Sequence, residues 1–193
     1  MMKKVVLDDI LGLNAYEKVR QEYRQRIIDL KKKRRISIGN KISLVFENRD
    51  TVVFQIQEML RAERITDLDK IRDEIAVYNE LIPAPSELSA SLFIEIEDQT
   101  NLREELLKFL GIDETVYLQV GKQRIRAAFE QGRSKEDKIS AVQYVRFQLD
   151  DQARKAFVGG APVSLSVEHE NYQATCTLTP EAHNALAADL MDA

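Results

Sequence analysis

The clearest candidate for a ligand site is the run from Glu47 to Asp50, where a predicted strand leads into a predicted helix. The first N–H groups of a helix have no partner inside the helix and attract anions, and Arg49 can add a two-pronged contact. Capping of the helix by Asn48 or Asp50, with an ion pair between Arg49 and a carboxylate, accounts for the same residues. Both interpretations stay open at this point.

A second candidate is the loop from Phe129 to Ser134, with the sequence FEQGRS. Gly132 allows the backbone to approach a ligand closely, and Arg133 supplies a positive charge for an anion. The same composition is also typical of an ordinary turn. The loop is therefore a second place where we expect a ligand to bind.

Metal ligands are few in this chain, which has the histidines His169 and His183 and the single cysteine Cys176. A zinc site needs three or four converging ligands, and no CxxC, HxxxH or HExxH spacing is present. Nucleophile, phosphate-loop and dinucleotide motifs are absent as well. We therefore predict no metal and no cofactor, and the sequence identifies no catalytic residue.

Composition limits the class of protein further. The chain has 193 residues, of which 44% are hydrophobic, enough for one large domain or two small ones. Lys and Arg number 28 against 32 Asp and Glu, and the net charge of −4 argues against a dedicated nucleic-acid binder. No apolar run approaches the ~18 residues of a membrane span. One cysteine in a chain this long fits a reducing compartment, so we expect a cytoplasmic protein.

The elements that must position the candidate residues are centred on residues 47–83, which predict two helices joined by the short connection Ile65–Thr66. Apolar residues recur in both helices at three- and four-residue steps, and the short connection favours antiparallel packing. Thr66 is the expected cap of the second helix, and Pro83 ends it. The two apolar stripes are Val52, Val53, Ile56, Met59 and Leu60, and Leu68, Ile71, Ile75, Tyr78 and Ile82.

Residues 14–33 predict a long amphipathic helix capped by Asn14. It runs into five cations, Lys31 to Arg35, which we expect to be a solvated helix end that the helix dipole stabilises. Contact of these cations with phosphate or an anionic partner is the alternative. Alternating apolar residues around Gly39–Asn40 then predict a β-hairpin.

Strands dominate after Pro83. Residues 89–97 and 141–149 predict strands, and residues 102–110 a short helix stopped by Gly111. Two hairpins have registers that place apolar residues on one face. Helices are expected after Leu149, through Phe157, and from Ala182 to Leu190. A turn at Gly121–Lys122 pairs Leu118 with Ile125 and Tyr117 with Arg126, and a turn at Glu170–Asn171 pairs Val167 with Ala174 and Leu165 with Cys176.

These elements predict an α+β fold in which a long helix, a β-hairpin and a helical hairpin pack with a mainly antiparallel C-terminal sheet. We expect a single domain over residues 1–193. The alternative is a subdivision into a mainly helical part, residues 1–83, and a mainly β part, residues 84–193.

Four segments carry a resemblance to a known family: ENRDTVVFQIQEMLRAER, YNELIP, FEQGRS and KISAVQYVRF. Over nearly its full length the chain resembles a bacterial family known only as a domain of unknown function. The resemblance implies one unit of about this length and supplies no activity, cofactor or catalytic residue. Genes of the family often lie beside rubrerythrin-like and iron–sulfur oxidoreductase genes, which implies a redox or oxidative-stress setting and a protein partner from it.

The leading functional hypothesis is a cytoplasmic, non-catalytic binding or interaction protein. Its expected partner is an anionic small molecule or a protein, and its expected assembly is a homodimer. The alternative is an enzyme or accessory subunit of a redox system, in which Glu47, Glu58 or Glu130 is the base of a Glu/Arg/Tyr pocket. A third hypothesis, nucleic-acid binding through Lys31 to Arg35, is not expected given the net charge. The candidate ligand-binding residues are Glu47, Arg49, Arg61, Arg64, Arg133 and Tyr144.

Overall fold

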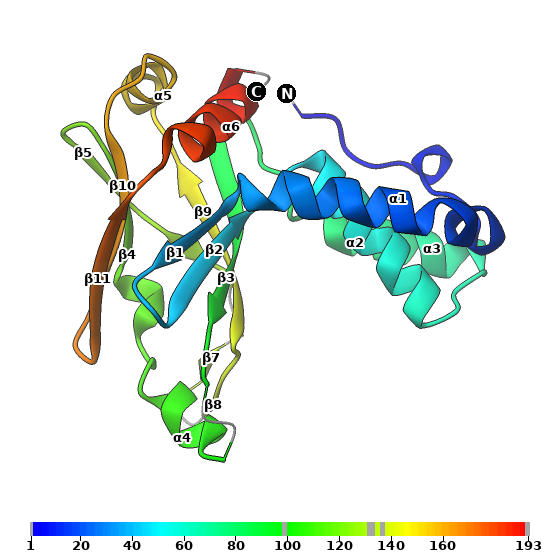
Figure 1. Cartoon of the computed structure of the whole chain (residues 1–193), viewed down its shortest axis with the longest axis horizontal. Coiled ribbons are helices and arrows are strands. Elements are labelled where there is room, and N and C mark those ends of the chain that lie inside the picture. Colours follow the sequence, from blue (N-terminus) through cyan, green and yellow to red (C-terminus); the bar gives the residue numbers. More distant parts are fainter. Residues whose placement is uncertain (1, 98–99, 131–133, 136–137, 192–193) are drawn as a thin grey trace.

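The computed structural model describes residues 2–97, 100–130, 134–135 and 138–191. Within them the chain forms six α-helices, a five-stranded sheet, a four-stranded sheet and a two-stranded ribbon, and the paired strands are antiparallel. Helices α1 to α3 lie together on one side of the two sheets (Figure 1). The predicted α+β fold is confirmed.

The helical module, as we call residues 2–32 and 48–82, contains three α-helices and the short 3-10 helix η1. Asn48 caps α2 as predicted, because its side chain accepts a hydrogen bond from the Thr51 N–H at 3.0 Å. The other two cap predictions are wrong. Helix α3 is capped by Asp67 rather than Thr66, and α1 follows Gly12, so that Asn14 lies inside the helix. The bounds are η1 Leu7–Asp9, α1 Leu13–Lys32, α2 Arg49–Ala62 and α3 Leu68–Asn79.

The apolar stripes of α2 and α3 form a core of their own, in which Val52, Ile56 and Ile75 are buried. Leu68 is 54% exposed, so its predicted place in the stripe is wrong. It is the first residue of α3, next to the connecting loop, and lies at the margin of the helix pair. The predicted helical hairpin is otherwise confirmed.

Residues 2–12 cross the helical module as an extended strap that the sequence analysis did not predict. The side-chain amide of Asn79 accepts from the Val5 N–H at 2.8 Å and donates to the Val5 carbonyl at 2.9 Å. Gln57 does the same for Leu11, at 2.6 and 3.1 Å. The two side-chain amides thus bond the strap as a neighbouring strand would, and Val5 of the strap is buried.

The five-stranded sheet has the order β1-β2-β3-β9-β6. Its hairpin β1–β2 turns at Gly39 and Asn40 as predicted. Strand β2 pairs with β3, although the helical hairpin separates the two strands in the sequence. This pairing joins residues on both sides of Pro83. The strands are β1 Arg35–Ile38, β2 Ile42–Phe46, β3 Glu87–Ile94, β9 Val142–Gln148 and β6 Ala128–Phe129.

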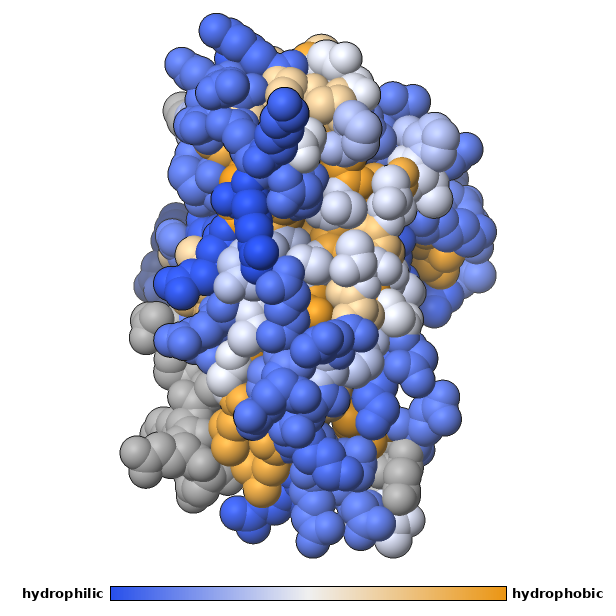
Figure 2. All heavy atoms as spheres, turned by 90° about the vertical axis from the view of Figure 1, so that its left-hand side faces the viewer, coloured by the Kyte–Doolittle hydropathy of each residue, from blue (hydrophilic) through white to orange (hydrophobic). Residues whose placement is uncertain are grey.

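The four-stranded sheet has the order β11-β10-β4-β5, and both predicted hairpin registers are confirmed. Its outer face, which faces the viewer in Figure 2, carries mainly residues of hydrophilic or intermediate hydropathy. This agrees with the alternating burial of side chains along β10 and β11. The inner faces of the two sheets enclose the main core. The strands are β4 Val116–Val120, β5 Gln123–Arg126, β10 Val163–His169 and β11 Tyr172–Thr177.

The remaining elements close the ends of the two-sheet body. Helices α5 and α6 contact each other, and α6 also contacts β3 (Figure 1). The bounds are α4 Leu102–Leu107, η2 Ile112–Glu114, β7 Ser134–Lys135, β8 Lys138–Ile139, α5 Asp151–Val158 and α6 Pro180–Met191. No helix among the described residues is both long and apolar enough to cross a membrane.

The basic run Lys31 to Arg35 is not uniformly solvated, and the prediction fails at Arg34, which is 2% exposed. Its Nε donates to the Phe46 carbonyl at 2.8 Å, and Nη2 forms an ion pair with Asp189 of α6. The partner lies 155 residues away in the chain. A buried guanidinium needs such partners, and the local sequence could not reveal them.

Candidate functional site

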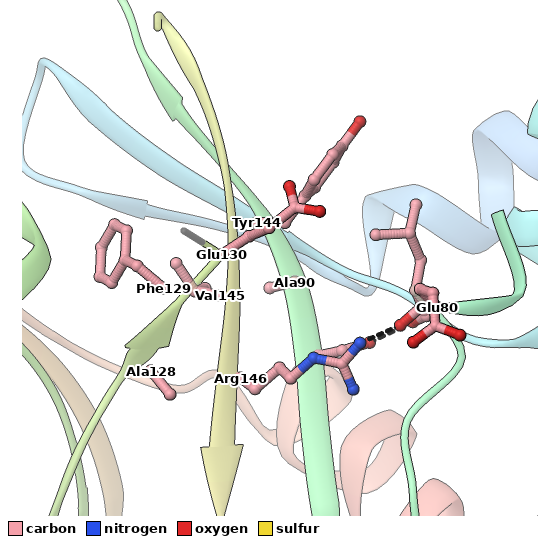
Figure 3. A pocket seen from close by; sticks show the side chains of 10 residues that line it. Glu80, Ala90, Ala128, Phe129, Glu130, Tyr144, Val145 and Arg146 are labelled. Carbon is pink, nitrogen blue, oxygen red and sulfur yellow. Dashed lines mark hydrogen bonds between the residues drawn. The ribbon is translucent and has the colours of Figure 1, made fainter. Parts of the chain in front are cut away.

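A hollow of about 230 Å³ lies between the end of α3 and strands β9 and β6 of the five-stranded sheet (Figure 3). Four segments line it: residues 80–81, 89–90, 128–130 and 144–146. We call it the Arg146 hollow, because Arg146 is the only cation among the described residues that line it.

Strand register leaves room for this hollow. Tyr144 and Arg146 share one face of β9, since side chains alternate along a strand. The neighbours of Arg146 across the two adjacent strands are Ser89 on β3 and Ala128 on β6. Because both are small, the sheet face is open beside the long Arg146 side chain.

The Arg146 guanidinium is fixed from two sides. Its Nη1 donates to Glu87 Oε1 at 2.8 Å, and its Nη2 donates to the backbone carbonyl of Glu80 (Figure 3). Glu80 follows the last turn of α3, where carbonyls lack helical partners and the helix dipole favours a cation. A guanidinium has five N–H donors, so donors remain for a third acceptor.

Tyr144 and Glu130 project to the same side of the sheet as Arg146 (Figure 3). Tyr144 also packs against the core of the helical module. Burial raises the pKa of Tyr78 on α3, and the nearby Tyr144 raises it further. The hollow is thus continuous with the helix pair, and it combines one cation, two glutamates and a phenol.

Glu47, predicted as a ligand-binding residue, is 3% exposed and bonded to the protein itself. Its carboxylate accepts from Ser91 Oγ at 2.6 Å, Thr51 Oγ1 at 2.5 Å and Gln55 Nε2 at 2.9 Å. These bonds join β3 to the start of α2. The structure therefore places Glu47 in the interior, beside the hollow, since Ser91 is the cross-strand neighbour of Tyr144.

The three predicted arginines that the structure describes do not converge on one site. Arg49 pairs with Asp9 at 2.5 Å, and Arg61 pairs with Glu17 at 2.5 Å. The two belong to opposite ends of α2, about 18 Å apart at 1.5 Å per residue. Arg64 is exposed in the loop after α2, with a φ of 54°. Arg133 lies outside the described residues.

Of the predicted residues that the structure describes, Tyr144 and the candidate base Glu130 line the hollow, whereas Arg146 was missed. The signal for Arg146 lies in the strand itself. A strand whose alternate residues Val145 and Phe147 point into the core carries Tyr144 and Arg146 on its other face. The alternation alone indicates that this other face is exposed to solvent. Its enclosure becomes evident only when β6 and α3 are placed beside β9.

Metal ligands do not gather in the part of the chain that the structure describes: no group of three or more His, Cys, Asp or Glu could hold an ion. His169, in the last pair before the β10–β11 turn, is 3% exposed, and its Nε2 lies 2.7 Å from the Leu110 carbonyl. Cys176 is half-buried, and burial raises the pKa of its thiol.

Three of the four segments that carry the family resemblance meet at the hollow. YNELIP supplies Glu80, FEQGRS supplies Glu130, and KISAVQYVRF supplies Tyr144 and Arg146. The fourth segment begins with Glu47, whose carboxylate accepts a hydrogen bond from Ser91. Ser91 is the cross-strand neighbour of Tyr144. The recognisable parts of the sequence therefore lie around this one place in the fold.

Comparison with known proteins agrees with this full-length resemblance. A crystal structure of a protein of unknown function from Burkholderia pseudomallei superposes with a TM-score of 0.92 at 37% identity, covering 97% of this chain and 100% of that one. No curated protein matches the chain. Residues 4–190 match the family described as protein of unknown function (DUF3501). The chain belongs to this DUF3501 family.

Proposed function

We propose that the protein is a non-catalytic binding protein and that the Arg146 hollow holds a small molecule through an anionic group. The observation that carries this proposal is the Arg146 guanidinium, which Glu87 and the end of α3 hold at the hollow with donors to spare. A guanidinium held in this way loses little freedom when it binds a carboxylate or phosphate.

The size and charge of the hollow limit the class of ligand that can bind there. Its 230 Å³ is below the roughly 300–1,000 Å³ of pockets for drug-sized molecules. Glu80 and Glu130 also line it, so a second anionic group beside them would be repelled. The expected ligand is a small metabolite with one anionic group and a neutral polar or positively charged group at its other end.

Binding is favoured over catalysis at this place. Glu87 is 10% exposed, but its carboxylate already accepts from Arg146 and from the Ala84 N–H at 3.1 Å. A carboxylate engaged in this way is poorly placed to take a proton from a substrate. The alternative of an enzyme in a redox system would have to use Glu130 and Tyr144 instead.

Calorimetric titration of the protein with small carboxylates, amino acids and phosphate esters tests the proposal. Arg146→Gln should weaken binding of any ligand found by about tenfold to a hundredfold, because a charge-assisted hydrogen bond is lost. Arg124→Gln is the matched control, since Arg124 is also half-exposed and pairs with Glu168 at 2.6 Å on the other sheet. Equal binding by the wild type and Arg146→Gln, or no binding by the wild type to any member of the panel, contradicts the proposal.

The remaining features of the proposal concern the setting of the protein. We infer a homodimer, a cytoplasmic location and a protein partner from a redox system. The location is supported by the half-buried thiol of the single Cys176, and the partner by the family resemblance.

A further inference from the structure

Helix α1 has an exposed face with a regular pattern. Six residues follow one another along this face at alternating steps of four and three, which places them on one side of the helix, where a second helix could pack. All six are exposed, and they are Ala15, Val19, Glu22, Arg26, Asp29 and Lys33. The opposite face of α1, with Tyr16 and Ile27, is buried against the helical module.

Two residues of this face, Glu22 and Arg26, carry opposite charges and lie at equal distances in the sequence from residue 24. A two-fold axis at residue 24 places each residue opposite the residue whose number is 48 minus its own. Glu22 then faces Arg26 of the second copy, and Arg26 faces Glu22. Lys18, on the edge of the same face, comes next to the second copy's Asp29. An antiparallel pair of identical helices thus brings Glu22 and Arg26 together twice on this face, once on each side of the axis.

We propose that this face of α1 is the homodimer interface, formed with α1 of a second copy in antiparallel orientation. The inference rests on the homodimer of the proposed function and is independent of the ligand site. A surface hollow of about 510 Å³ lies at the centre of the face, where Val19, Glu22, Tyr23 and Arg26 line it. It offers the second helix space for its own side chains.

The central side chains are already ordered. Tyr23 stacks on Phe54 of α2, with ring centroids 5.9 Å apart and planes at 14°. The Arg26 guanidinium lies over the Tyr23 ring, 4.7 Å from its centroid. A cation held on an aromatic face loses less freedom when it meets a carboxylate.

Overlap of the helices fixes the register. With the axis at residue 24, the two α1 helices lie side by side over nearly all of their 20 residues, about 30 Å. A shift that centres Arg26 on Asp29 also pairs unlike charges, but it moves the start of each helix past Lys33 and over the other copy's sheets. We therefore assign the register in which Glu22 meets Arg26.

Charge reversal tests this interface. Analytical ultracentrifugation over a concentration series should show a dimer for the wild type. Glu22→Arg or Arg26→Glu alone places two pairs of like charges at the centre and should weaken association on the order of a hundredfold. The double variant Glu22→Arg, Arg26→Glu exchanges the two charges and should restore the dimer. Lys155→Glu, on the exposed face of α5, is the control for a change of net charge.

Each other outcome overturns the inference. A monomeric wild type removes both the homodimer and this interface, and it leaves ligand binding to Arg146 untouched. Single variants that stay dimeric place the contact elsewhere. A double variant that stays monomeric rules out the Glu22–Arg26 register. If the charges act only along their own helix, the reversals shift the melting temperature and leave the mass unchanged.

Discussion

At the scale of single residues, Gly39 shows how a turn can depend on a side chain far away in the chain. Its φ of 71° favours glycine, and a Cβ there would lie 2.3 Å from the Tyr172 hydroxyl. That hydroxyl donates to the Ile38 carbonyl at 2.6 Å and accepts from the Lys41 N–H at 3.1 Å. The turn and β11 are therefore joined through Tyr172.

Gly39→Ala should lower the free energy of unfolding by about 2–4 kcal/mol, since backbone strain and the collision with Tyr172 add. Gly160→Ala is the matched control, because Gly160 also has a positive φ, 84°, but nothing lies within 4 Å of an added Cβ. It should cost only about 1 kcal/mol. Urea unfolding measures both. A cost of Gly39→Ala no greater than that of the control, or unchanged when Tyr172 is Phe, contradicts the account.

At the scale of elements, local patterns predicted most of the fold. Both late hairpins followed from a period of two and a turn residue, and α2 followed from its stripe and the Asn48 cap. Two features that the sequence analysis missed depend on distant partners. The strap over residues 2–12 needs the amides of Gln57 and Asn79, and burial of Arg34 needs Asp189. The candidate site was predicted only in part, at Glu130 and Tyr144, because the hollow exists only once β6 and α3 flank β9.

The joint between α1 and α2 makes stability depend on pH. Glu58 accepts from Arg20 Nη2 at 2.7 Å and from the Tyr16 hydroxyl at 2.7 Å. The bond from Arg20 is the main reason that the pKa of Glu58 lies below its ordinary value of 4.5, and the bond from Tyr16 also lowers this pKa. A lowered folded-state pKa stabilises the protein above that ordinary value, and this contribution is lost as the pH falls through the folded-state pKa.

Glu58→Gln should therefore cost on the order of 1–2 kcal/mol at neutral pH and progressively less in acid. Denaturant unfolding of both proteins, from neutral pH to below 4.5, measures the difference. Glu170→Gln, at the exposed tip of the β10–β11 hairpin, is the control and should follow the wild type. A Glu58→Gln cost that stays constant across this range would show that the charge of Glu58 is unimportant.

At the scale of the whole molecule, Arg34 and Asp189 connect the helical module to the two-sheet body. Arg34 follows the end of α1, its guanidinium donates to the carbonyls of Phe46 and Glu47, and Asp189 comes from α6. The Asp189 side chain is 10% exposed, so its removal leaves a buried cation without its counter-ion. Such a loss typically costs about 3–5 kcal/mol.

The same ion pair gives a test of whether residues 1–193 unfold as one domain. The chain has no tryptophan, so Phe54→Trp on α2 and Phe93→Trp on β3 would each give a unique fluorescent probe. If the chain is one cooperative unit, the two probes report the same unfolding midpoint, and Asp189→Ala lowers both midpoints equally. If the parts before and after residue 83 are separate units, the two midpoints differ, and Asp189→Ala displaces them by different amounts. Because β2 pairs with β3 and Arg34 binds α6, contacts between the two parts run through the interior, and we expect one transition.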